Sequence, residues 1–137
     1  MNKEFIPYEE ARLLKGLGFN EPCLRYYWEG ATELMGNNTS PKTNWELTDL
    51  SNSDLKGLEG TVFMTAPLYQ QAFRWFRKER NLYPILERVI TTSLVKFRYS
   101  LFIGSNEYIK YFDTYEEAEL ACLVKLIEIL NQNKEDE

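Results

Sequence analysis

Residues that commonly carry catalytic chemistry are scarce in this sequence. None of its 137 residues is histidine, which excludes Ser-His-Asp and Cys-His arrangements, histidine general bases and mixed Cys/His zinc sites. The two cysteines, Cys23 and Cys122, lie in different predicted elements among apolar residues, a pattern typical of buried thiols in a reducing compartment. No glycine-rich phosphate loop or zinc-protease motif occurs. We therefore expect no catalytic residues, no cofactor and no metal.

Carboxylates are the remaining candidates for acid–base chemistry or for a hard metal ion. Glu116, Glu117 and Glu119 form one such group. They fall in the first turn of a predicted helix, where negative charge stabilises the helix dipole. Thr114 precedes Glu117 by three residues, which is the spacing of a capping box. This structural role explains the acidic group, so a carboxylate enzyme is the least favoured hypothesis.

Basic side chains are concentrated in the centre of an acidic chain. Residues 74–98 contain seven basic and two acidic residues, a net charge of +5, whereas the whole chain has −5. A local basic face can bind phosphate in spite of an acidic total charge. The alternative is an amphipathic helix with core aromatics and solvated arginines. The candidate nucleic-acid contacts are Arg74, Arg77, Lys78, Arg88, Lys96 and Arg98.

An aromatic strand is the second candidate binding feature. Tyr26, Tyr27 and Trp28 place aromatic rings on both faces of one predicted strand. A protein partner or self-association would cover an exposed face, because Tyr and Trp are enriched at interfaces. The alternative is a central strand whose two faces are both covered within the fold. Trp45, in the following loop, is a further candidate anchor.

Three predicted helices and several strands would position these side chains. Apolar residues at helical spacing predict helices from Pro7 to about Gly16, from 66 to 80 and from 114 to 130. Strands are expected at 23–28, 95–103 and 108–112, and further short strands at 45–48 and 61–64. Residues 85–90 predict either a strand or a helical turn. Gly104, Ser105 and Asn106 mark a hairpin turn. The predicted class is α+β, an antiparallel sheet of about four to five strands with three helices, in the order α-β-(β)-α-β-β-β-α.

Alternation along residues 95–103 predicts which side chains face the core. Val95, Phe97, Tyr99, Leu101 and Ile103 fall on the apolar face. The opposite face would present Lys96, Arg98 and Ser100.

The length fits one domain spanning residues 1–137. Residues 30–60 are rich in Asn, Ser, Thr and Gly and predict a loop-rich insertion, and residues 131–137 predict a frayed polar tail. No apolar run reaches the 18 or so residues of a membrane span, and the acidic N-terminal segment does not resemble a secretory signal. We expect a cytoplasmic protein that does not bind membranes.

Three stretches together resemble a known group of sequences. They are IPYEEARLLKGLGFNEPC at 6–23, APLYQQAFRWFRKERNL at 66–82 and TYEEAELACLVKLIEI at 114–129, about a third of the chain. The set is similar to a family of short hypothetical proteins of Bacteroidetes and their bacteriophages, which has no assigned activity. The resemblance implies a phage or prophage accessory protein in a bacterial cytoplasm. The order of elements in residues 95–130 is also similar to that of the small arm domains of phage integrases.

The leading functional hypothesis is therefore non-catalytic binding of a protein partner, with modulation of a host function or defence as its effect. The alternative is binding of a nucleic acid or nucleotide through the basic segment. The candidate partner anchors are Tyr26, Tyr27, Trp28 and Trp45.

Overall fold

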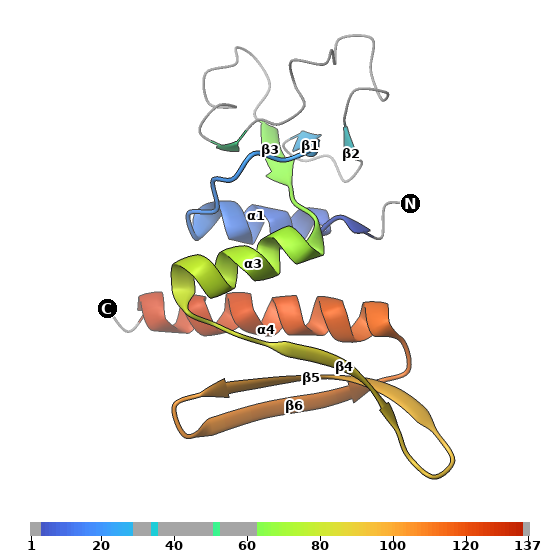
Figure 1. The fold of residues 1–137 in the computed structure, drawn as a ribbon. Coiled ribbons are helices and arrows are strands. Elements are labelled where there is room, and N and C mark those ends of the chain that lie inside the picture. The colour runs from blue at the N-terminus through green and yellow to red at the C-terminus, as the bar shows by residue number, and fades with distance from the viewer. Residues whose placement is uncertain (1–3, 29–33, 36–50, 53–62, 136–137) are drawn as a thin grey trace. The chain divides into compact units, whose positions relative to one another are not determined.

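The computed structural model describes residues 4–28, 34–35, 51–52 and 63–135 (Figure 1). In chain order the elements are α1 (Tyr8–Gly16), β1 (Arg25–Trp28), β2 (Leu34–Met35), β3 (Phe63–Ala66), α3 (Tyr69–Arg80), β4 (Ile85–Ile90), β5 (Val95–Ile103), β6 (Asn106–Phe112) and α4 (Tyr115–Glu135). The α+β class and the predicted order are confirmed. The described strands form two three-stranded antiparallel sheets, β2-β1-β3 and β4-β5-β6, instead of one sheet of four to five strands.

The chain divides into two compact units, residues 1–68 (unit 1) and 69–137 (unit 2). The single domain expected from length stays a prediction, and each unit is described by itself. None of the helices in the described part of the chain is long and apolar enough to cross a membrane.

Unit 1 is built around the central strand β1. Helix α1 begins after Pro7, whose fixed φ suits the start of a helix, and ends before Gly18, which has the positive φ of 100° that glycine tolerates best. Strand β1 pairs with β2 on one side and with β3 on the other. The Asn52 side-chain amide links the segment after α1 to strand β3. It donates to the carbonyl of Phe19 (2.8 Å) and accepts from the N–H of Thr65 (2.9 Å).

Unit 2 contains the second sheet and helices α3 and α4. The apolar stripe predicted for α3 is buried at Ala72, Trp75 and Phe76. The helix ends at Arg80, and Asn81 follows with a left-handed φ of 57°, a conformation that asparagine adopts more readily than most residues. The segment that could have been a strand or a helical turn is the strand β4.

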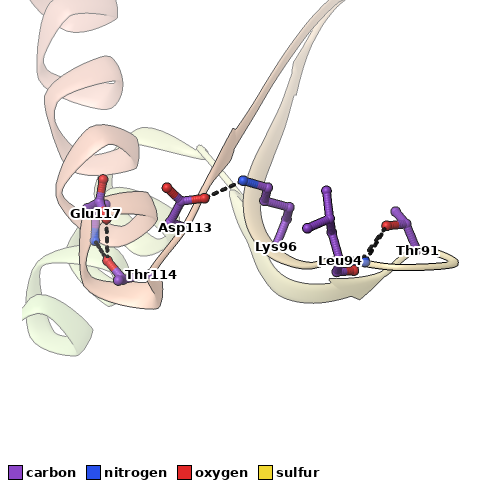
Figure 2. Close-up of polar contacts among 6 residues, drawn as sticks. All are labelled: Thr91, Leu94, Lys96, Asp113, Thr114 and Glu117. Carbon is purple, nitrogen blue, oxygen red and sulfur yellow. Dashed lines mark hydrogen bonds and ion pairs between the residues drawn. The ribbon is translucent and has the colours of Figure 1, made fainter.

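The β5–β6 hairpin confirms the predicted turn. Ile103 pairs with Asn106, so Gly104 and Ser105 form a two-residue connection. Gly104 has a φ of 59°, as tight hairpin turns between twisted strands require. At the other end of β5, Thr91 and Leu94 hold the β4–β5 connection through hydrogen bonds of 3.0 and 3.3 Å that involve the Thr91 hydroxyl (Figure 2).

Helix α4 begins at the predicted cap. The Thr114 hydroxyl accepts from the backbone N–H of Glu117 (3.2 Å) and donates to the Glu117 carboxylate (2.9 Å) (Figure 2). The helix continues to Glu135, into the segment expected to be a frayed tail. It contacts β4, β5, β6 and α3, and its broad apolar face is buried, as at Cys122, Leu123 and Leu126.

The structure also sets the bounds of the remaining predicted strands. Strand β1 starts at Arg25, two residues after the predicted start, and β3 covers 63–66 where 61–64 was expected. The strand predicted at 45–48 lies outside the described residues, as does most of the predicted 30–60 insertion.

The cap of α4 yields a stability prediction. Thr114→Ala removes the side-chain acceptor of the Glu117 N–H, so we expect the free energy of unfolding to fall by about 1 kcal/mol. Denaturant titration measures the loss. Thr92→Ala, in the exposed β4–β5 connection, is the matched control and should change the free energy by less than about 0.5 kcal/mol. Equal effects of the two substitutions would contradict the capping role.

Candidate functional site

The two tyrosines of the aromatic strand β1 are buried and do not lie on the protein surface. Tyr26 and Tyr27 are 2% and 4% exposed, because β1 is the central strand of its sheet and both of its faces are covered. The Tyr26 hydroxyl donates to the carbonyl of Cys23 (3.1 Å), and that of Tyr27 donates to the carbonyl of Ile6 (2.9 Å). The proposal that these two tyrosines anchor a partner is therefore wrong. The Trp28 side chain and Trp45 lie outside what the structure describes.

The six basic candidates do not form one patch. Arg74, Arg77 and Lys78 are exposed on α3. Arg88 pairs with Phe97 and therefore shares its face of the sheet. That face is the one next to α4, since the Phe97 ring contacts the ring of Tyr115 in α4.

Lys96 and Arg98 lie on the opposite face of the sheet, and both have acidic partners. The Lys96 ammonium forms an ion pair with Asp113 (Figure 2). The Arg98 guanidinium pairs with Glu87, donates to the Tyr111 hydroxyl (3.1 Å) and lies 5.9 Å from the centre of that ring. These hydrogen bonds, to Tyr111 and to Glu87, raise the pKa of Arg98. This face of the sheet is therefore a nearly balanced set of charges.

The same face displays large apolar side chains. Strand pairing aligns Ile85, Ser100 and Ile109 in one row and Glu87, Arg98 and Tyr111 in the next, with Val89 beside Lys96 and Glu107 beside Phe102. We call these ten residues the open face. Its exposed side chains include Ile85, Phe102, Ile109 and Tyr111, at 49%, 59%, 37% and 54% exposure.

Sequence reasoning assigned Lys96, Arg98 and Ser100 to the open face and missed its apolar part. The alternation that placed those three residues also places Phe102 with them, so this signal was present in the sequence. The contribution of β4 could not be found, because the sequence did not settle whether residues 85–90 form a strand.

The reactive groups of the described residues have structural roles. Burial, together with the nearby Glu119, raises the pKa of the Cys122 thiol to about 12, so this thiol stays protonated and is a poor nucleophile. Glu117 belongs to the cap of α4, and burial with Glu116 nearby raises the pKa of Glu119. Within the described ranges, no group of three or more Cys, Asp or Glu residues is placed to hold a metal ion.

Comparison with known proteins adds no family. No family model, no curated protein and no solved structure matches this chain.

The buried Tyr27 yields a pH-dependent prediction. Burial, with a smaller effect of Glu10, raises the pKa of Tyr27 to about 12. The unfolded phenol ionises near a pKa of about 10. The contribution of the protonated Tyr27 to the free energy of unfolding is therefore complete below about pH 10. It is lost as the pH rises toward 12.

We expect Tyr27→Phe to lower the free energy of unfolding by about 1 kcal/mol at neutral pH, because the Ile6 carbonyl loses its donor. In this variant, the free energy of unfolding should also decrease less between pH 10 and pH 12 than it does in the wild type. Denaturant unfolding across a pH series measures both effects. Tyr83→Phe, at an exposed position, should behave as the wild type. A parallel decline in Tyr27→Phe and wild type would contradict the assignment.

Proposed function

We propose that this chain is a non-catalytic binding protein that acts on a protein partner, and that the open face is its contact surface. The observation that supports this most is the exposure of Ile85, Phe102, Ile109 and Tyr111 on one face of one sheet. Single exposed apolar residues are ordinary on a protein surface. Several on one face, in contact with polar neighbours, are typical of interaction sites.

The arrangement around Arg98 supports a protein partner. Arginine and tyrosine, together with tryptophan, are enriched among the interface residues that dominate binding energy. Here Glu87 and Tyr111 both hold the Arg98 guanidinium, so little side-chain freedom is left to lose when a partner covers it. The near balance of charge on this face also favours a mixed polar and apolar surface over a polyanion.

The biological setting follows from the sequence resemblance. Similarity to short proteins of Bacteroidetes and their phages supports a phage or prophage accessory role in the cytoplasm of a bacterial host. The partner is then a host or phage protein, and the effect is modulation of a host function or defence.

A double substitution on the open face tests this function. Phe102→Ser with Tyr111→Ser removes two exposed apolar rings, and recovery of the partner from a Bacteroidetes lysate should fall by about tenfold or more. Quantitative mass spectrometry of proteins retained by the tagged full-length chain measures it. Ile90→Ser with Leu94→Ser is the matched control, since both side chains are exposed apolar groups at the β4–β5 connection. The same retained proteins for wild type and the open-face variant would overturn the proposal.

A second function is favoured by the exposed face of α3. Arg74, Arg77 and Lys78 stand three and four residues apart, so they share one side of the helix. All three are exposed. Three cations on one helix face can contact the phosphates of a nucleic acid. The candidate nucleic-acid site therefore consists of these three basic residues and no longer of all six.

The two functions are separable by titration with nucleic acid. If α3 binds DNA, Arg77→Ala with Lys78→Ala should weaken binding and reduce the salt dependence of the logarithm of affinity by about two. Fluorescence anisotropy with a labelled duplex over a salt series measures it. Lys96→Ala with Arg98→Ala is the control and should leave the affinity unchanged. Absence of binding by the wild type at low salt would remove this second function.

A further inference from the structure

A groove runs between α4 and the outer edge of β6 in unit 2. It encloses about 540 Å³ and is open to solvent on one side. Tyr108 and Lys110 line it from β6, and Ala121, Val124 and Lys125 line it from α4. Its volume lies within the range of established binding sites. In Figure 1, α4 extends along the sheet that includes β6.

The strand beside this groove is an edge strand. The sheet order is β4-β5-β6, and no strand among the described residues pairs with the outer edge of β6. An edge strand presents a row of backbone N–H and C=O groups that can pair with another chain. β6 covers seven residues, a length of roughly 20 Å at strand spacing. The edge can therefore accept an extended segment of about five to seven residues.

The charged residues of the groove indicate which kind of segment could bind there. The Lys125 ammonium lies 4.4 Å from the centre of the Tyr108 ring and 3.8 Å from the Glu128 carboxylate, so it already has neighbours. Lys110 is exposed and has no ion-pair partner among the described residues. A carboxylate on the occupant would complement this lysine.

A second copy of the chain fits this groove less well. The residues of β6 that face α4 are Asn106, Tyr108, Lys110 and Phe112, by alternation from Tyr108. This set contains no acid. Pairing of two β6 edges would therefore bring a second lysine to the groove in place of a carboxylate.

We infer that the groove binds an extended peptide segment of another protein, which adds to β6 as a fourth strand. Backbone hydrogen bonds to the β6 edge supply the sequence-independent part of the affinity. Every second side chain of the segment points toward α4. Apolar side chains there pack on Tyr108 and Val124, and one acidic side chain pairs with Lys110. The groove also borders Glu107 and Ile109 of the open face. The side chains of Phe102 and Tyr111 point away from α4, so their substitution separates the two sites.

A displayed library of random nine-residue peptides, selected against the full-length chain, is the probe. We expect the enriched sequences to alternate apolar residues and to share one acidic position. Lys110→Glu should weaken the selected peptides by about tenfold and should shift a new selection toward a basic residue at that position. Val124→Glu should also weaken binding. Lys78→Glu, the same charge reversal on α3, and the Phe102→Ser, Tyr111→Ser variant should bind as the wild type does.

Amide hydrogen exchange locates the bound peptide. Strand addition should slow exchange at residues 106–112 when the peptide binds. Failure to enrich any peptide, unchanged binding by Lys110→Glu, or protection confined to other residues would overturn the inference. A dimeric free protein whose 106–112 amides are already protected would assign the edge to a second copy and would overturn it as well.

Discussion

Helix α4 is buried on two sides, and its packing shapes the rest of unit 2. The helix contacts all three strands of the β4-β5-β6 sheet and also α3, and Cys122, Leu123 and Leu126 are fully buried. Each buried leucine contributes about 1.5–3 kcal/mol. Because one helix covers one face of a three-stranded sheet, the other face remains open and one edge of the sheet lies beside a groove. The two candidate binding features are thus consequences of how α4 packs.

Several reactive and charged groups of this unit are engaged within the fold. The Cys122 thiol lies in the same apolar interior that stabilises α4, and its pKa of about 12 follows mainly from that burial. The charges of Lys96 and Arg98 are matched by Asp113 and Glu87. In the described part of this unit, the accessible groups are apolar side chains, the backbone edge of β6, the basic side chains of α3 and Lys110, which has no ion-pair partner among the described residues. Such groups bind other molecules through shape and hydrogen bonding and provide no activated nucleophile.

The candidate site could be predicted only in part. Alternation assigned Lys96 and Arg98 to the uncovered face of their strand, which the structure bears out. The cluster of positive charge in residues 74–98 suggested one basic surface, but the strand and helix periods distribute those side chains over α3 and over both faces of the sheet. The prediction that Tyr26 and Tyr27 contact a partner was wrong for another reason. Tyr26 and Tyr27 have the same sequence pattern whether their strand is central or at an edge, and the structure makes it central.

Local sequence patterns were enough to predict most of the helices and strands and several of their caps and turns, because these depend on interactions between residues close in the chain. The Thr114–Glu117 cap, the Gly104 turn and the apolar stripe of α3 were all readable in this way. Packing between distant parts of the chain sets three further features: the division of the strands into two sheets, the end of α4 at Glu135, and the face of the second sheet that stays exposed. Those outcomes depend on packing partners distant in sequence, and a residue's own neighbours along the chain do not specify which surface will cover it.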